Sequence, residues 1–180
     1  MSGSGVPLPA RANTSAMPKI NVRPAQPGDC ELVCELIREL AKYEKLAHVC
    51  LVTPGALREQ LFGVRPAAEC VMGELDGVAQ GFALFFQNFS TFMAKPGLYL
   101  EDLFVRPAAR GHGLGEALLR RLAQIACERG YGRMEWSVLD WNEPAIGFYR
   151  KLGAMPMDEW TVFRVTGDSL ASLANAERAG

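Results

Sequence analysis

The feature that most constrains the fold is a glycine-rich segment between an apolar strand pattern and an amphipathic helix pattern. Residues 98–105 read LYLEDLFV, residues 110–115 read RGHGLG, and a helix pattern with its leucines on one face covers residues 115–130. A helix start leaves about four backbone N–H groups without partners and carries a partial positive charge. Because glycine removes the side chains that would keep an anion away, the segment predicts a site for a phosphate or a diphosphate.

Two known phosphate-binding patterns can be compared with this segment. The P-loop pattern G-x-x-x-x-G-K-S/T occurs nowhere in the sequence. The Rossmann pattern fails as well, because Glu116 stands at the position of its third glycine and several residues separate the strand from the first glycine. Arg106 and Arg110 add positive charge beside the segment. An ordinary flexible turn before a helix is the alternative interpretation.

The composition is that of one globular domain. The chain has 180 residues, of which 49% are hydrophobic, and we expect a single domain over residues 19–180. Residues 1–18 are rich in Gly, Ser, Pro and Ala and lack the apolar stretch of a signal peptide, so we interpret them as a disordered leader or an artificial extension. The formal net charge of -1, from 19 basic and 20 acidic residues, gives no electrostatic reason to expect nucleic acid or a membrane surface as a partner.

The five cysteines are scattered and contain no C-x-x-C pair. They predict neither a disulfide framework nor a zinc site, and we expect no metal and five small, buried apolar side chains. No apolar run approaches the ~20 residues that cross a bilayer. Free thiols and this composition together favour a cytoplasmic location.

Hydrophobic periodicity predicts the element order β-α-α-β-β-β-α-β-α-β, with Asp29 as the cap of the first helix. This order describes an α/β (α+β) fold with a mixed, mostly antiparallel sheet that is flanked by helices and is parallel around the glycine-rich crossover. The expected strands cover residues 19–25, 68–75, 78–87, 98–105, 133–140 and 159–165; the expected helices cover residues 28–46, 53–63, 115–130, 144–153 and a short tail at 168–174.

Several motifs, in matching order, resemble one known family. The segment RGHGLG matches the pattern Gln/Arg-x-x-Gly-x-Gly/Ala of the GNAT superfamily of N-acetyltransferases. The resemblance continues through YLEDLFVRPAARGHGLG, LDWNEPAIGFYRKLGA and RPAQPGDC with LIRELAKYEKL, and it covers about residues 21–165. YLED, ELAKYE and DWNEPAI are most similar to the diamine (spermidine/spermine) and thialysine N-acetyltransferase branch. The resemblance implies a single-domain GNAT fold, acetyl-CoA as co-substrate and a homodimer.

The resemblance also implies where acetyl-CoA binds. In this family the diphosphate lies on backbone amides of the glycine segment, and the pantetheine arm pairs with the backbone of the preceding strand. Asn142 matches a family residue on the pantetheine side. The main chain of His112, and not its imidazole, is expected to matter. The implied cofactor-binding residues are Leu103, Phe104, Val105, Arg110, Gly111, His112, Gly113, Leu114, Gly115, Glu116 and Asn142.

Glu101 and Asp102 are unusual neighbours in an apolar strand. Consecutive strand residues face opposite sides, so at least one carboxylate should point toward a covered face. Burial of an unpaired carboxylate costs several kcal/mol or raises its pKa. A local bulge that lets both side chains reach solvent is one interpretation. The functional interpretation is that Glu101 accepts the proton of an amine through water and that Asp102 holds a cationic substrate.

Tyr149 lies in a predicted helix beside Phe148, where a core aromatic is the alternative. The match of NEPAIGFY to the family motif implies that Tyr149 is the general acid that protonates the departing thiolate. With Glu101 as base, the amine attacks the acetyl carbonyl directly, and a backbone N–H of the bulged strand steadies the oxyanion. This route needs no covalent intermediate and no cysteine.

The resemblance implies acceptor contacts at Tyr43, Glu44, Phe92, Asp102 and Trp160, although packing in the core is an alternative for Trp160. The sequence departs from polyamine acetylators, since Ala47 and His48 replace acidic residues and residues 90–92 replace an Asp-Pro-Trp type of stretch. We therefore expect a shorter amine, such as thialysine, a related amino acid or a small diamine, as the acceptor.

Three other functions remain open at this point. A non-catalytic acetyl-CoA-binding regulatory module would keep the glycine segment but would need neither Glu101 nor Tyr149. A protein or peptide N-acetyltransferase would need an open groove for its substrate. A nucleotide-binding oxidoreductase is disfavoured by the failed Rossmann pattern.

Overall fold

The computed structural model describes residues 17–175, which fall into two compact units divided between Ser137 and Val138. Each unit is described by itself below. Nearly all of the leader predicted for residues 1–18 lies outside the described residues.

The first unit contains a five-stranded sheet with the strand order β1-β2-β3-β4-β5. The first four strands pair antiparallel, and β5 pairs parallel with β4. The α/β fold with a mostly antiparallel sheet is thereby confirmed, including the parallel pair around the glycine-rich crossover. The strands are β1 Ile20–Pro24, β2 Glu69–Leu75, β3 Val78–Ser90, β4 Lys95–Val105 and β5 Met134–Trp136.

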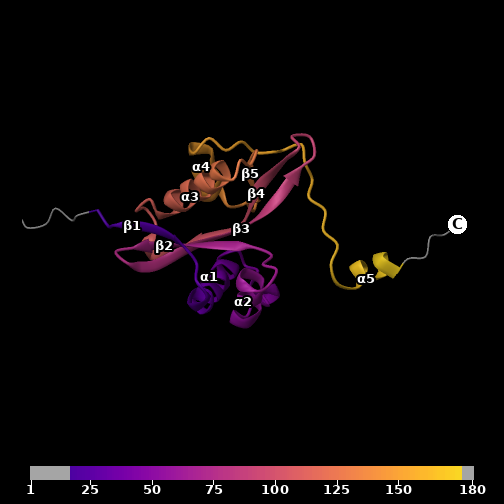
Figure 1. Cartoon of the computed structure of the whole chain (residues 1–180), viewed down its shortest axis with the longest axis horizontal. Helices are drawn as coiled ribbons and strands as arrows, with labels where there is room; N and C mark the ends of the chain where they lie inside the picture. Colours follow the sequence, from indigo (N-terminus) through magenta and orange to yellow (C-terminus); the bar gives the residue numbers. More distant parts are fainter. Residues whose placement is uncertain (1–16, 176–180) are drawn as a thin grey trace, which may run out of the picture. The chain divides into compact units, whose positions relative to one another are not determined.

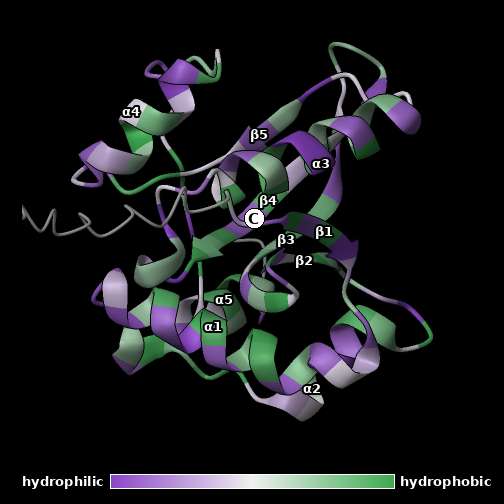
Figure 2. Ribbon diagram, turned by 90° about the vertical axis from the view of Figure 1, so that its left-hand side faces the viewer, coloured by the Kyte–Doolittle hydropathy of each residue, from purple (hydrophilic) through white to green (hydrophobic). Residues whose placement is uncertain are grey.

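Helices cover both faces of this sheet (Figure 1). On one face α1 and α2 build a core with the sheet, in which Leu36, Met72 and Phe82 are fully buried. On the other face α3 packs closely, because a Cβ atom at Gly73 would lie 3.0 Å from the Leu114 side chain. Figure 2 shows apolar and polar bands alternating along α1 and α3, as one buried face per helix requires. The helices are α1 Cys30–Tyr43, α2 Pro54–Phe62 and α3 Leu114–Glu128, with 3-10 turns at Pro27–Asp29, Ala47–Val49 and Pro107–Ala109.

Local sequence signals explain several of these boundaries. The Thr53 hydroxyl accepts a hydrogen bond from the Ala56 N–H at 3.2 Å, as predicted for the cap of α2. Asp76 and Gly77 both have positive φ, which gives the turn between β2 and β3 the twist of a hairpin. Asp29 stands at the N-cap position of α1 as predicted, but its side chain makes no capping hydrogen bond, because its carboxylate accepts from the Gln26 N–H and binds Arg23 instead.

The second unit begins after β5 and contains α4 Glu143–Lys151 and α5 Gly167–Asn175. Both helices were expected. The strand predicted for residues 159–165 is wrong: in the described part of the chain these residues form no strand, and Phe163 is 90% exposed. A strand needs a neighbour for its backbone groups, which periodicity alone does not provide. The strand predicted for residues 133–140 shrinks to β5 for the same reason.

The cysteines are all free thiols, but they are not all buried. Cys30, Cys34 and Cys70 are buried as expected, whereas Cys50 is half-buried and Cys127 is exposed. No helix within residues 17–175 combines the length and the apolar composition that crossing a membrane requires.

Candidate active site

The glycine segment forms a turn that opens directly into α3. Gly111 and Gly113 have φ of 81° and 86°, a conformation that side chains disfavour, so glycine is required at both positions. Among the described residues, the backbone N–H groups of residues 111–116 have no recorded acceptor. Six consecutive donors at a helix N-terminus are the setting in which proteins bind phosphate groups.

The backbone amide of Arg110 differs from its neighbours. Its N–H donates to the Pro107 carbonyl at 3.2 Å within the preceding 3-10 turn. Its side chain folds back along the strand, where Nε donates to the Val105 carbonyl at 2.9 Å. Of the seven amides predicted to hold a diphosphate, Arg110 is therefore the one that is already engaged.

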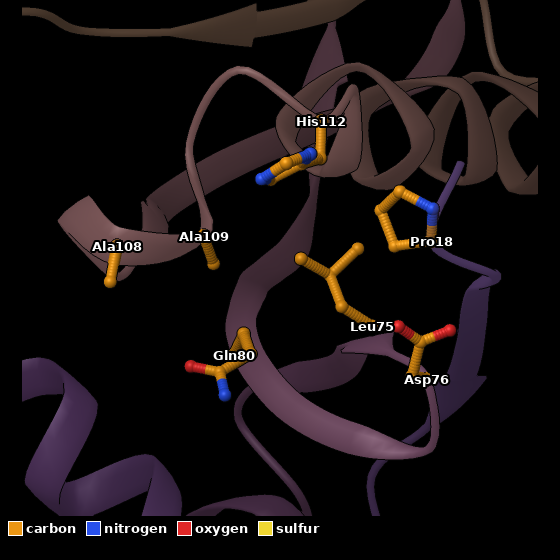
Figure 3. A pocket seen from close by; sticks show the side chains of 7 residues that line it. All are labelled: Pro18, Leu75, Asp76, Gln80, Ala108, Ala109 and His112. Carbon is orange, nitrogen blue, oxygen red and sulfur yellow. The ribbon is translucent and has the colours of Figure 1, made fainter. Parts of the chain in front are cut away.

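His112 presents its imidazole to a shallow pocket on the other side of the turn. This pocket, of ≈ 360 Å³, is lined by residues that include Leu75, Asp76 and Gln80 around the β2–β3 turn (Figure 3). Neither Glu101 nor Asp102 is among its lining residues. The expectation that the main chain of His112 matters, and not its imidazole, stays a prediction.

The last residues of β4 have an open edge on the side of β5. The pairing of β4 with β5 involves Leu98, Tyr99 and Leu100 and does not extend to Leu103 or Val105. The Arg106 N–H donates to the Gln80 carbonyl at 2.9 Å. Backbone groups of an antiparallel strand alternate in direction, so the polar groups of Leu103 and Val105 point away from β3. An extended ligand can pair with this edge.

Phe104 differs from Leu103 and Val105 in this respect. It lies opposite Phe82, and its backbone groups face β3 by the same alternation. Its buried side chain belongs to the core under α1 and α2. Phe104 therefore holds β4 to β3 and to the core, whereas Leu103 and Val105 supply the backbone donors and acceptors of the open edge.

Glu101 sits at an irregularity in the sheet. Leu84 pairs with Asp102 and Phe85 pairs with Leu100, so Glu101 is the extra residue of a β-bulge. Its side chain is exposed, whereas that of Asp102 is largely covered. The predicted bulge is present, and Asp102 is half-buried, as expected for at least one of the two carboxylates. The functional interpretation of the pair stays a prediction.

The surroundings of Asp102 change its acidity. Burial raises the pKa of the Asp102 carboxyl to about 6, and the charges of Glu101 and Glu44 add to this rise. Burial also raises the pKa of Glu44, which follows the last residue of α1. The negative charges of Glu101 and Glu44 thus act on Asp102, which favours the approach of a cation.

Tyr43 ends α1 beside this group. The guanidinium of Arg110 lies 5.1 Å from the centre of the Tyr43 ring and 5.8 Å from that of Phe104. One side chain therefore touches both the β4 edge and the predicted acceptor residue on α1. No sequence pattern indicates this contact, because Arg110 and Tyr43 are far apart in the chain and neither belongs to a pairing motif.

The positive charge of Arg106 is already paired within the protein, although in the sequence it counts as charge beside the glycine segment. Its Nε and Nη2 bind Glu39 on α1 at 3.0 and 2.8 Å, and Nη2 also binds Glu35. Glu35 and Glu39 are one helical turn apart, which is why a single guanidinium reaches both. This ion pair fastens the end of β4 to α1.

In the second unit, Tyr149 belongs to α4 and Asn142 is the residue directly before that helix. Asn142 is buried, and its carbonyl accepts the Ala145 and Ile146 N–H groups, each at 3.0 Å, at the start of the helix. Tyr149 is half-buried, with its ring centre 5.4 Å from that of Phe148. Their predicted roles toward acetyl-CoA stay predictions.

Two predicted acceptor residues are highly exposed. Trp160 is 70% exposed, so the alternative of core packing is wrong within its unit. Phe92 is 97% exposed at the tip of the β3–β4 hairpin. Six residues of extended β4 separate Lys95, next to this tip, from Glu101, which corresponds to about 20 Å along the strand. The contacts of both residues with an acceptor stay predictions.

Comparison with known proteins places these features in a family. The profile of the Acetyltransferase (GNAT) family matches residues 36–154, a stretch that includes the end of α1, the bulge in β4, the glycine turn and α4. The chain belongs to this family. As a member it is an acyltransferase, and acetyl-CoA is the co-substrate of GNAT enzymes.

Individual relatives of this GNAT protein are similar along most of the chain. The thialysine N-epsilon-acetyltransferase of Bos taurus is 36% identical over 166 residues, which cover 86% of this chain and 97% of the relative. The L-ornithine N5-acetyltransferase of Arabidopsis thaliana is 32% identical and covers 84% of this chain and 86% of its own length. An integron cassette protein of V. cholerae has a solved structure with a TM-score of 0.74 and 25% identity, covering 87% of this chain and 98% of its own.

Within residues 17–175 no group of three or more His, Cys, Asp and Glu side chains is arranged to hold a metal ion.

Proposed function

We propose that this GNAT enzyme transfers the acetyl group of acetyl-CoA to a primary amine of a small molecule, namely thialysine, a related amino acid such as ornithine, or a short diamine. The observation that carries the proposal is the run of six unpaired N–H groups at residues 111–116 next to the open edge of β4. The names of the relatives from Bos taurus and Arabidopsis thaliana support the acceptor class.

The residues around the glycine turn fit acetyl-CoA. The N–H groups of residues 111–116 match a diphosphate, and the outward groups of Leu103 and Val105 match the amides of a pantetheine arm. Acetyl-CoA supplies the activated acetyl thioester. The backbone N–H groups of the glycine turn orient the bound acetyl-CoA. A substitution that changes the backbone of this turn therefore removes that orientation.

Glu101 is the proposed general base. A primary amine is protonated at neutral pH and has no lone pair for attack until it loses that proton. The exposed carboxylate of Glu101, at the bulge, accepts the proton through a water molecule. The bulge also leaves a backbone N–H without a ladder partner, and this group is the proposed donor to the oxyanion.

Tyr149 is the proposed general acid and Asn142 a proposed contact of the pantetheine arm. Tyr149 lies on the short helix α4 and Asn142 directly precedes it, within the stretch that matches the family. The Tyr149 hydroxyl gives its proton to the departing sulfur, so the amine attacks directly and no acyl-enzyme forms. Transfer in one ternary complex follows.

The acceptor side is proposed to consist of Tyr43, Glu44, Phe92, Asp102 and Trp160. Burial raises the pKa of both Glu44 and Asp102 because it disfavours their charged forms, so an ammonium group that pairs with them stabilises the carboxylates. Ala47 and His48 provide no further carboxylates, which limits attraction for long polycations. An acceptor with one or two amines is the best match.

A screen of acetyl transfer tests the proposed function. Thialysine, ornithine, lysine, putrescine, spermidine and a lysine-containing peptide are each incubated with acetyl-CoA and the full chain, and the released thiol is measured. We expect the highest kcat/KM with thialysine, ornithine or putrescine. Transfer only to the peptide, or no transfer above the rate without enzyme, would reject the proposal.

We also propose that the protein is a homodimer in the cytoplasm. The diamine and thialysine branch that the sequence resembles supports the dimer, and the five free thiols support the reducing compartment. Light scattering of the purified chain measures the dimer directly, and a monomeric mass at micromolar concentration would contradict it.

A further inference from the structure

Arg110 connects the two sides of the candidate active site through a single side chain. Its Nε donates to the Val105 carbonyl at 2.9 Å, and its guanidinium lies 5.1 Å from the centre of the Tyr43 ring. Val105 belongs to the edge of β4 that faces a cofactor, and Tyr43 belongs to the acceptor side. A ligand that binds at the Val105 carbonyl or at the Tyr43 ring therefore alters a contact of Arg110.

The hydrogen bond to Val105 uses a group that an extended ligand also needs. The Val105 carbonyl points away from β3, toward the open edge, by the alternation that the Arg106–Gln80 hydrogen bond fixes. A pantetheine amide that pairs with this edge donates to the Val105 carbonyl and so competes with the Arg110 Nε for that acceptor. A ligand on the β4 edge thus displaces the arginine, and the diphosphate beyond it attracts the released charge.

The contact of Arg110 with Tyr43 disfavours binding of the acceptor amine. The guanidinium lies over one face of the Tyr43 ring and brings a positive charge to that ring. A protonated amine that approaches the same residues is repelled by that charge and competes for the same ring face. Removal of Arg110 from Tyr43 therefore favours the amine.

The surrounding ion pair keeps this geometry in place. Arg106 binds Glu39, one turn before Tyr43 on α1, while Arg110 follows Arg106 by four residues. Arg106 thus links α1 to the end of β4, and Arg110 takes no part in that ion pair. Arg106 therefore has a structural role, whereas the contacts of Arg110 change when a substrate binds.

We propose that Arg110 is a positioning residue that makes the binding of acetyl-CoA and of the amine cooperative, so that each substrate strengthens the binding of the other. This inference rests on the proposed function. When both substrates bind, Arg110 loses its hydrogen bond to Val105 and its cation–π contact with Tyr43. The energies of these two contacts correspond to a coupling of about tenfold in affinity. Because linkage is reciprocal, the same factor applies to either order of addition.

The test uses coenzyme A and thialysine, which bind together without reacting. Calorimetry measures the Kd of coenzyme A alone and in the presence of saturating thialysine, for the wild type and three variants. The coupling factor is the ratio of the two Kd values. Since it is a ratio, it is independent of any loss that a variant causes in both measurements.

We expect a coupling factor of about ten for the wild type. Arg110→Ala and Tyr43→Leu, which alter opposite ends of the contact, should each bring it to within about twofold of one. Glu39→Gln is the matched control: it removes one of the two carboxylates that bind Arg106 and lowers the melting temperature, but Glu35 still binds Arg106 and neither contact of Arg110 is altered, so the wild-type factor should be kept.

Two results would overturn the inference. A wild-type factor near one, with both ligands binding individually, rejects cooperativity while the proposed function stands. A factor near ten in Arg110→Ala shows that coupling runs through other residues. Failure of the wild type to bind coenzyme A or thialysine would reject the proposed function itself, and the inference with it.

Discussion

Glu44, directly after α1, contributes its negative charge to the raised pKa of Asp102 on β4. Burial is the larger cause, and Glu101 adds a second charge. The charges of Glu44 and Glu101 thus both disfavour ionisation of Asp102. Such an arrangement reduces the stability of the free protein and favours a cationic ligand, a trade-off that is common at functional sites.

Asp102→Asn should stabilise the protein in a pH-dependent way. The pKa of Asp102 is about 6 in the folded protein and near 3.8 when unfolded, so the ionised group opposes folding above pH 6 and has no effect once both states are protonated. We expect the variant to be more stable by up to about 2–3 kcal/mol at pH 8 and nearly unchanged at pH 4. Urea unfolding at both pH values measures this, and an equal difference at both would refute the burial of an ionised Asp102.

Gly113→Val should abolish the binding of coenzyme A. Gly113 has φ of 86°, which a β-branched residue adopts only with strain, so the turn must rearrange and the N–H groups of residues 111–116 lose their alignment. Calorimetry should show a loss of at least about 100-fold in affinity, the scale of two lost charge-assisted hydrogen bonds. Gly28→Ala, where a Cβ meets no atom within 4 Å, is the control and should bind normally. Retained affinity in Gly113→Val would separate the turn from the cofactor.

Tyr149→Phe should lower kcat by about 10²–10³-fold with little change in the Kd of coenzyme A, because only the proton donor is lost. Tyr131→Phe is a matched control, since the Tyr131 hydroxyl donates to Gln87 and has no proposed catalytic role. Steady-state kinetics and calorimetry together measure both quantities. Unchanged turnover in Tyr149→Phe would remove Tyr149 from the mechanism.

Glu101→Gln should lower kcat/KM by about 10²-fold at pH 7.5. The defect should shrink toward pH 10, because an alkyl amine then loses its proton without help from a base. Glu128→Gln, at the exposed end of α3, should behave like the wild type at every pH. The pH profile of kcat/KM decides the matter: a defect that is constant from pH 7.5 to pH 10 would show that Glu101 acts in some way other than proton removal.

The sequence predicted the elements that depend on local patterns. Thr53 capped α2 as expected, and the glycines between β4 and α3 marked a turn with free N–H groups, because both signals act within a few residues. The acid pair pointed to a bulge or a buried carboxylate, and the fold has both.

Features that depend on distant partners were not predictable in this way. Residues 159–165 have a strand pattern, yet pairing requires a neighbouring strand that periodicity cannot identify. The contacts of Arg106 with Glu39 and of Arg110 with Tyr43 join segments more than 60 residues apart. Only the packing of α1 against the end of β4 brings these side chains together.

The measurement that most directly tests the account is a crystal structure of the protein with coenzyme A. We predict diphosphate oxygens within about 3.2 Å of backbone nitrogens among residues 111–116, with the pantetheine arm paired to Leu103 and Val105. A diphosphate bound elsewhere, or crystals without ligand after soaking at saturating concentration, would contradict it.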